Sequence, residues 1–221
     1  FAYPSFNAFF TRALKPGVRP IDGSERDLVS PVDGTLSQLG IVREGQLLQA
    51  KGLHYTAGDL LGDESAARRY EGGGFACIYL APYNYHRIHM PLAGYLSATR
   101  YVPGQLFSVN AATSRVIPGL FARNERVVCE FDTECGPLAV VGALFVGSIE
   151  TVFAGEINPP GRRGGRAHSV EAGIGRQLPR GEELGRFNMG STVVLLLGNH
   201  ATRFAAGLAP GAVTDAQAGA F

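Results

Sequence analysis

Apolar and polar residues alternate in short runs along this chain, and the pattern predicts many strands and few helices. Largely apolar runs recur at 75–80, 138–144 and 193–197, and an alternating, amphipathic strand is expected after a turn at 123–126. Runs of this length that are rich in β-branched and aromatic residues are typical of buried strands. Glycine, at 30 of 221 residues, is frequent enough to supply the turns between them. We therefore expect an α+β, β-rich fold.

Helical periodicity is confined to short stretches, chiefly near the N-terminus. Phenylalanine and leucine residues recur at helical spacing over 6–14, with Ser5 suited to cap the helix and Pro16 to end it. Two interpretations of the aromatic face stay open. It packs against the core or a second copy, or it contacts a membrane, which the neighbouring Arg12 and Lys15 would favour. A second short helix is expected over 51–61, and 64–70 extends it.

The loops between strands carry clear turn signals. Glu44-Gly45 predicts a hairpin within 40–49, and Gly147 divides 138–154 into two central strands. The segment 159–175 is rich in glycine, proline and arginine, which predicts a flexible surface loop with His168 exposed. The charged residues within 123–132 are expected to form a solvated rim, with an arginine there as an alternative ligand for an anionic headgroup.

Composition narrows the function classes. The net charge of +1 gives no electrostatic case for a nucleic-acid partner. Cys77, Cys129 and Cys135 are odd in number and lack metal-binding spacing, so we expect a reducing compartment, no disulfide framework and no zinc site. The longest apolar tract, 138–149, is too short for a bilayer span of roughly 20 residues. Peripheral attachment to a membrane stays open.

A Gly-Ser step directly before the last apolar run is the first candidate for chemistry. Gly190 adds no side chain and tolerates strained backbone angles, so the peptide bond to Ser191 is open to attack. Ser191 is thus a candidate nucleophile against its own backbone. Taken alone, the pair is better explained as a turn that enters a strand.

Two further segments offer partners for a serine. Tyr83-Asn84-Tyr85-His86-Arg87-Ile88-His89 places two histidines in a dense polar and aromatic cluster after a buried strand. On a helix the histidines would share a face and could bind a metal, but prolines bracket them and no third ligand follows. Asp33 lies in Ser-Pro-Val-Asp-Gly, a turn sequence in which the carboxylate caps its own backbone or orients a base.

In combination, these stretches make the sequence resemble the phosphatidylserine decarboxylases, the longer bacterial type above all. The matching segments are FNAFFTRALKPGVRPID, SPVDGTLSQLG, YNYHRIHMPLAG, YVPGQLFSVN, LFARNERVV, VGSIETVFAGEI and GRFNMGSTVV. They span about nine-tenths of the chain in the family's order. One departure is Met189, where the family usually has leucine, a swap that conserves volume.

The resemblance implies a self-cleaving enzyme that converts phosphatidylserine to phosphatidylethanolamine. Cleavage between Gly190 and Ser191 would make a chain of residues 1–190 and a chain of residues 191–221, with Ser191 converted to a covalent pyruvoyl group. Asp33, His89 and Ser191 would be the self-processing triad. His86 is the first candidate for protonating the product, and His89 is the second.

The resemblance also implies how the chain is organised. Residues 1–221 would form a single catalytic domain with a barrel-sandwich or duplicated-hybrid core, present as a homodimer of cleaved protomers. Its substrate would lie in a membrane surface, with the enzyme peripheral on the cytoplasmic face of a bacterial cell membrane.

Three rival functions stay open on the sequence. A serine hydrolase could use Ser191, His89 and Asp33 on an external acyl group, although no GxSxG motif is present. Another pyruvoyl enzyme could act on a small amino acid. A lipoyl-like β module without chemistry would leave the Gly190–Ser191 bond intact.

Overall fold

The computed structural model describes residues 3–50, 52–144, 147–157, 165–199 and 203–217. The largest sheet is antiparallel, and its strands run in the order β11-β6-β7-β8-β14-β4-β1-β15, with β12 also paired to β6. Its strands are β1 (Gly34–Ile41), β4 (Gly74–Leu80), β6 (Gly94–Val102), β7 (Arg126–Thr133), β8 (Gly136–Leu144), β11 (His168–Ser169), β12 (Gln177–Leu178), β14 (Ser191–Leu197) and β15 (Val213–Thr214).

A smaller sheet and a hairpin complete the strands. The smaller sheet has the order β10-β9-β13-β5, and the hairpin joins β2 to β3. Their bounds are β5 (Arg87–His89), β9 (Ile149–Thr151), β10 (Gly155–Glu156), β13 (Glu183–Phe187), β2 (Gln46–Ala50) and β3 (Leu53–Thr56). The helices are short: α1 (Phe6–Phe10), α2 (Ala57–Leu61), α3 (Glu64–Ala67), a 3₁₀ turn (Arg68–Tyr70), α4 (Ala111–Ser114) and α5 (Leu120–Arg123).

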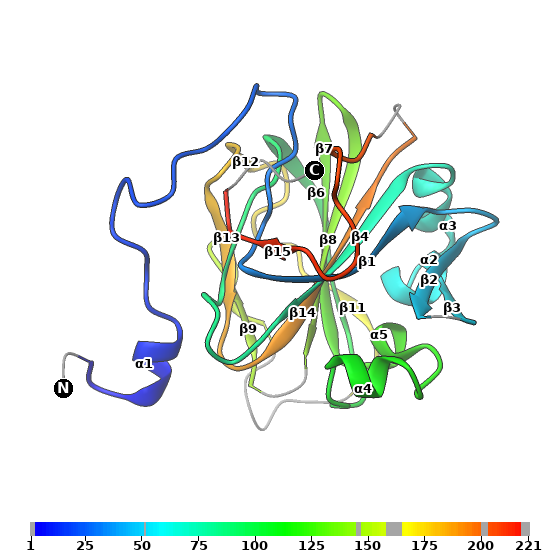
Figure 1. Ribbon diagram of the computed structural model, residues 1–221, viewed down its shortest axis with the longest axis horizontal. Coiled ribbons are helices and arrows are strands. Elements are labelled where there is room, and N and C mark those ends of the chain that lie inside the picture. Colours follow the sequence, from blue (N-terminus) through cyan, green and yellow to red (C-terminus); the bar gives the residue numbers. More distant parts are fainter. Residues whose placement is uncertain (1–2, 51, 145–146, 158–164, 200–202, 218–221) are drawn as a thin grey trace.

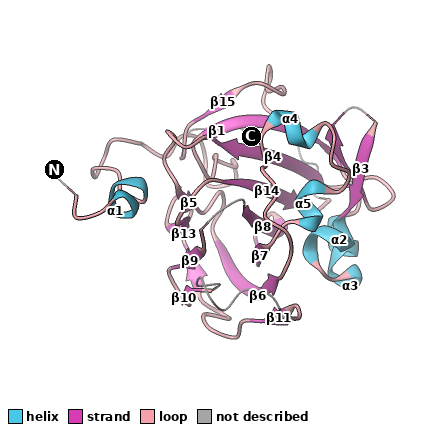
Figure 2. Ribbon diagram, turned by 90° about the horizontal axis from the view of Figure 1, so that it is seen from below, coloured by secondary structure: helices cyan, strands magenta, loops and turns pink. Residues whose placement is uncertain are grey.

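The large sheet has an apolar core on each face. On one face, residues such as Ile78, Val193 and Leu195 pack against Ile88 and Phe187 of the smaller sheet. On the other, alternate residues of the same strands pack against α2, α5 and the β2–β3 hairpin. Figures 1 and 2 show the large sheet between these two layers, with α1 at the side of the smaller sheet. The chain is thus a β sandwich with helices on one side, which confirms the β-rich α+β class.

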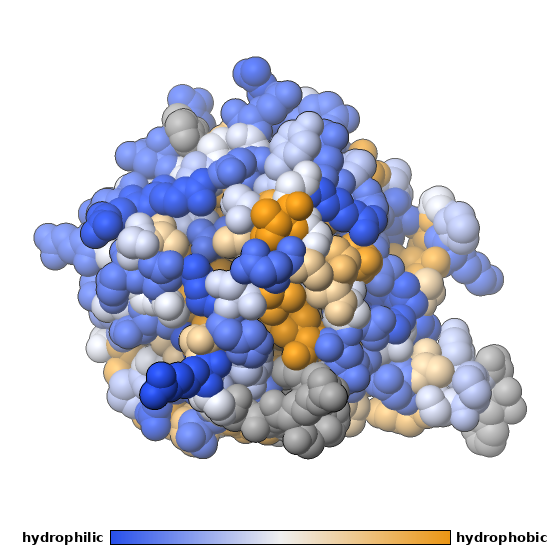
Figure 3. Space-filling view, turned by 180° about the vertical axis from the view of Figure 1, so that it is seen from behind, coloured by the Kyte–Doolittle hydropathy of each residue, from blue (hydrophilic) through white to orange (hydrophobic). Residues whose placement is uncertain are grey.

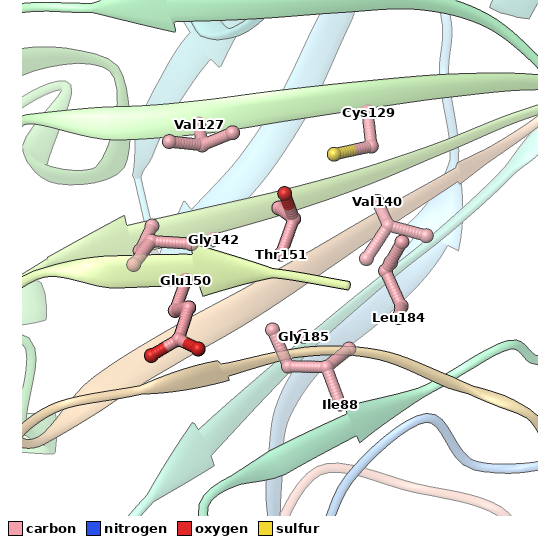
Figure 4. A pocket seen from close by; sticks show the side chains of 10 residues that line it. Ile88, Val127, Cys129, Val140, Gly142, Glu150, Thr151, Leu184 and Gly185 are labelled. Atoms are coloured by element: carbon pink, nitrogen blue, oxygen red, sulfur yellow. The ribbon is translucent and has the colours of Figure 1, made fainter. Parts of the chain in front are cut away.

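The two sheets pack closely. Figure 4 shows the side chains that meet between them: Val127, Cys129, Val140 and Gly142 from the large sheet, and Ile88, Glu150, Thr151, Leu184 and Gly185 from the smaller one. The cavity they line has about 10 Å³, room for no more than about one water molecule. A substrate therefore cannot enter between the sheets at this point.

The surface is largely polar. Seen from behind, it is mostly hydrophilic, with one strip of hydrophobic side chains near its centre (Figure 3). Within the described ranges, no helix has the length and apolar character needed to cross a bilayer. Exposed aromatic side chains are found on and beside α1, at Tyr3, Phe6 and Phe9.

Several local expectations are confirmed. The Ser5 hydroxyl caps α1 by accepting from the Ala8 backbone N–H at 3.1 Å. Glu44 and Gly45 both have positive φ in the turn between Arg43 and Gln46, as a two-residue hairpin requires. The 138–154 segment forms β8 and β9, and Gly147 between them has a φ of 82°.

Three expectations were wrong or fall partly outside the described residues, and the structure also excludes the helix that the sequence left open, and disfavoured, for the two histidines. The N-terminal helix ends at Thr11, before Pro16, because the Thr11 hydroxyl bonds back to the Asn7 carbonyl oxygen and Arg87 binds the Thr11 carbonyl oxygen. The two histidines are not on a helix, since β5 ends the cluster. Residues 159–164 of the expected loop lie outside the described residues, and 168–169 form β11 against β6, with His168 exposed as expected.

The third of these expectations concerns the charged residues within 123–132, where three are buried rather than part of a solvated rim, while Arg123 and Asp132 are exposed. Glu125, Arg126 and Glu130 are almost fully buried. The Arg126 guanidinium donates to the backbone carbonyl oxygens of Leu60, Asn124 and Asp59, so carbonyl groups compensate its charge. Burial lowers its pKa to about 10. These charges support the fold and are not available to a headgroup.

Candidate active site

Ser191 begins β14, a strand that is paired on both sides. Ser191 lies opposite Leu80 of β4 and Leu144 of β8. Its side chain shares the face of Val193 and Leu195, which is the face covered by the smaller sheet. The hydroxyl is buried and has no hydrogen-bond partner. An unpaired buried hydroxyl is costly, so this is a position at which chemistry rather than stability explains the residue.

Gly190 leaves the backbone beside that hydroxyl uncovered. A Cβ built on Gly190 would meet no atom within 4 Å, whereas one built on Gly147 would lie 2.9 Å from the backbone of Asn188. The preceding turn is held to β9 by Asn188, whose side chain and backbone N–H both bond Ser148 at 2.9 Å. The peptide bond before Ser191 therefore follows an anchored turn and has space around its glycine.

Asp33 directly precedes β1, two strands across from Ser191. The β1–β4 register places Gly34 one step beyond the Thr35–Tyr79 pair, on the row of Ser191, so Asp33 comes within about 10 Å of Ser191. The carboxylate is nearly buried. Arg19 binds both of its oxygens, at 2.8 and 3.0 Å, and the backbone N–H of Ala216 donates to it at 2.8 Å.

His89 ends β5, beside the segment that carries Asp33. Its backbone N–H donates to the Pro31 carbonyl oxygen at 2.8 Å. Its ring is bonded at both nitrogens, Nδ1 to the Gly181 carbonyl oxygen at 2.8 Å and Nε2 to the Tyr85 hydroxyl at 3.0 Å. Burial lowers the pKa of His89, while the nearby Asp33 carboxylate raises it by a smaller amount.

His86 lies just before β5 and is fully buried. Its Nδ1 bonds the Asn84 carbonyl oxygen at 2.8 Å, and its Nε2 has no partner. The ring centroid is 4.0 Å from that of Phe10 in α1. Burial lowers the pKa of His86 to about 4. The ring is therefore neutral near pH 7, with its proton on Nδ1 and a free lone pair on Nε2.

The structure gathers the four candidate residues at one end of the sandwich but does not join them in a chain of hydrogen bonds. Among the hydrogen bonds of the described residues, none links Asp33 to His89 or either histidine to Ser191. Arg19 occupies the carboxylate, and Gly181 and Tyr85 occupy the imidazole of His89.

Sequence reasoning missed the residues that hold these groups. Tyr85 belongs to the cluster that the sequence singled out, so its neighbourhood was a usable signal. Arg19 and Gln217 had none, because they reach the site from opposite ends of the chain. The Gln217 amide donates to the Gly181 carbonyl oxygen at 2.8 Å, and its backbone has a φ of 71°, a conformation that non-glycine residues rarely adopt.

A cavity opens beside His89 and Tyr85. It has about 310 Å³ and is bounded by the N-terminal segment 13–21, Glu183 and Gln217. The guanidinium of Arg87 binds Glu183 at 2.6 Å along one wall. The N-terminal segment thus contains Arg19, which binds Asp33, and it also lines the cavity beside the rings of Tyr85 and His89.

The residues present fit a carbonyl group formed from Ser191. Among the described residues, neither Ser191 Oγ nor His86 Nε2 has a partner, although both are buried, so each has unused hydrogen-bonding capacity. Across the described ranges, no group of three or more potential metal-ligating side chains is present.

Comparison with known proteins gives a consistent result. The profile of the phosphatidylserine decarboxylase family matches residues 6–219. A phosphatidylserine decarboxylase proenzyme of Shewanella sp. (strain MR-4) is 57% identical over 96% of this chain and 75% of its own length. The protein of the same name from Shewanella baltica (strain OS155 / ATCC BAA-1091) is 56% identical over the same shares.

Proposed function

The chain belongs to the phosphatidylserine decarboxylase family, and from this premise we propose that it converts phosphatidylserine to phosphatidylethanolamine after cutting itself between Gly190 and Ser191. The observation that carries the self-cleavage is the buried, unpartnered Ser191 hydroxyl behind an open glycine at the start of a central strand. Two relatives of 56–57% identity are named proenzymes, which supports a precursor that is processed.

The first stage acts on the chain itself. Ser191 Oγ attacks the Gly190 carbonyl carbon while its proton passes to His89. The C–N bond then breaks, the nitrogen of residue 191 regains a proton, and an ester joins Gly190 to the serine oxygen. The Asp33 carboxylate favours the cationic ring that forms on His89, because it raises the pKa of His89 through space.

The ester is then lost by elimination. Removal of the α proton of residue 191 expels the Gly190 carboxylate, and water replaces the nitrogen, which leaves as ammonia. Residues 1–190 and 191–221 result as two chains. The ketone then present at residue 191 supplies the electron sink that decarboxylation of an amino acid requires.

In the second stage the product carbon needs a proton where CO₂ has left. His86 is our first candidate donor, and His89 is the second. In the uncut chain the Nδ1–H of His86 donates to the Asn84 carbonyl oxygen, so Nε2 must gain a proton before it can deliver one. The N-terminal cavity beside His89 offers a route from solvent.

The substrate is a membrane lipid, so we propose peripheral attachment at the cytoplasmic face of the cell membrane. The aromatic side chains of α1 and the nearby Arg12 and Lys15 are the candidate contact with the anionic interface. We further propose that the cleaved protomers form a homodimer and that residues 1–221 make one catalytic domain.

The relatives' shared name favours this function over a serine hydrolase or a non-catalytic module. The test compares the wild-type chain with Ser191→Ala, and uses Ser37→Ala, a part-buried serine of β1, as the control. Intact mass is expected to show fragments 1–190 and 191–221 in wild type and Ser37→Ala, with decarboxylase activity on phosphatidylserine in detergent. Ser191→Ala is expected to stay uncut and inactive. Full activity in an uncut wild-type chain would overturn the proposal.

A further inference from the structure

The hydrogen bonds of His89 define which of its nitrogens can act as a base. Nδ1 faces the Gly181 carbonyl oxygen at 2.8 Å, and a carbonyl oxygen only accepts. The proton of the neutral ring is therefore on Nδ1, and Nε2 carries the lone pair. The Gln217 amide nitrogen donates to the Gly181 carbonyl oxygen at 2.8 Å and lies 3.2 Å from Nδ1. The Nδ1–Gly181 distance is the shorter of the two Nδ1 contacts, and two acceptors would repel each other at 2.8 Å, so the proton belongs on Nδ1. A backbone carbonyl thus selects the tautomer, a role usually assigned to a carboxylate.

Tyr85 fills the remaining position on the ring. Its hydroxyl lies 3.0 Å from Nε2, and its ring stacks against the imidazole with centroids 5.7 Å apart. With the ring proton on Nδ1, Nε2 can only accept, so the Tyr85 hydroxyl donates its proton to Nε2. Tyr85 is nearly fully buried, so surrounding residues hold its ring, and one side of it lines the cavity beside His89.

We propose that Tyr85 is a positioning residue for self-cleavage, which holds the His89 ring in place and keeps Nε2 unprotonated until the Ser191 hydroxyl replaces it. The proposal rests on the proposed function, since it concerns the base of the first stage. When Ser191 Oγ attacks Gly190, its proton goes to Nε2 and the Tyr85 hydroxyl is released. The Tyr85 hydroxyl keeps its own proton throughout this step.

Charged groups on every neighbouring element face this pair. Glu183 lies across from His89 on β13, and Arg87 binds it. Asp33 precedes β1, and Arg19 of the N-terminal segment binds it. Lys15, from the same segment, lines the cavity beside His89 and Tyr85. None of these groups changes when the Tyr85 hydroxyl alone is removed. A shift in the pH dependence of cleavage in Tyr85→Phe is then caused by the loss of the hydroxyl.

The test follows self-cleavage of full-length chains made by cell-free synthesis, at pH values from 5 to 8. Tyr85→Phe removes a hydrogen bond that favours the neutral ring, and such a bond is worth about 0.5–1.5 kcal/mol. We expect cleavage about 3- to 10-fold slower and a pH midpoint about 0.5 to 1 unit higher, since one pH unit corresponds to about 1.4 kcal/mol. Tyr83→Phe, a neighbouring tyrosine that is 81% exposed, is the matched control and is expected to match wild type.

An unchanged or faster rate in Tyr85→Phe would overturn the proposal, and so would a slower rate with an unchanged midpoint, which marks a purely structural role. A second measurement does not depend on cleavage. In the uncut Ser191→Ala chain, nitrogen NMR of labelled histidine is expected to show His89 protonated at Nδ1, and its pKa is expected to rise on adding Tyr85→Phe. A proton on Nε2 would overturn the proposal. Cleavage in Ser191→Ala would instead overturn the proposed function.

Discussion

At the scale of single residues, His86 shows how burial sets chemistry at this site. The ring is fully buried against Phe10, and one of its nitrogens has no partner. Burial is the main cause of its lowered pKa, the positive charge of Arg12 lowers it further, and the bond to the Asn84 carbonyl oxygen opposes both. A free histidine titrates near about 6.5, so His86 is kept neutral over a range in which the unfolded chain becomes charged.

This difference predicts acid sensitivity of the folded, uncut chain. Between a pH of about 6.5 and the folded pKa of about 4, the unfolded state binds more protons, so the free energy of unfolding decreases as pH falls. Thermal unfolding of Ser191→Ala at pH 7.5 and pH 5 should show the loss. Adding His86→Gln should reduce the dependence, and His168→Gln, at an exposed histidine, should leave it unchanged. The same loss in all three chains would contradict the prediction. His89, whose pKa is also lowered, accounts for the remainder.

At the scale of elements, α1 is a short helix anchored by its inner side only. Phe10 packs on His86, and Arg87 Nε donates to the Thr11 carbonyl oxygen at 2.9 Å. Phe6 and Phe9 face outward, with 65% and 46% of their surface exposed. A helix of this length is not stable in water by itself, so the contacts to the body hold it. Its exposed face is therefore presented in a fixed orientation next to the site.

We expect the double variant Phe6→Ser/Phe9→Ser to bind vesicles containing phosphatidylserine at least about 10-fold more weakly, since fully burying one phenylalanine is worth about 1.5–3 kcal/mol. Co-sedimentation with the vesicles measures this binding. Val213→Ser, at another highly exposed apolar residue, serves as the control and should bind as wild type does. Equal binding by the double variant would show that α1 is not the contact.

The elements also show what the sequence could and could not predict. Ser5 as a cap, the Glu44-Gly45 turn and the strand after Ser191 depend on neighbours in sequence, and all three were predicted. The hydrogen bonds that hold the site residues in place join residues that are far apart in the sequence. Gln217 and His89 are 128 residues apart, and the Arg19–Asp33 pair forms only once the N-terminal segment crosses the body. Local patterns carry no information on such contacts, so the sequence could suggest the four candidates but not their hydrogen-bond partners.

At the scale of the whole molecule, the proposed cut falls at the edge of a central strand rather than in a loop between domains. β14 is paired with β4 over six residue pairs and with β8 over seven. Its side chains alternate between the two cores, with Val193 and Leu195 on one face and Val194 and Leu196 on the other. The chain that begins at residue 191 is thus held by backbone pairing on both edges and by apolar packing on both faces.

We therefore predict that fragments 1–190 and 191–221 stay together after cleavage without a covalent link. Exposing four buried aliphatic side chains would cost about 1.5–3 kcal/mol each, in addition to the loss of the strand pairing. Under native conditions, size-exclusion chromatography should show both fragments in one peak, and in denaturant they should separate. Uncut Ser191→Ala should elute at the native position. Release of the short fragment without denaturant would mean that β14 leaves the sheet on cleavage, and the ketone at residue 191 would then lose the buried surroundings of His86.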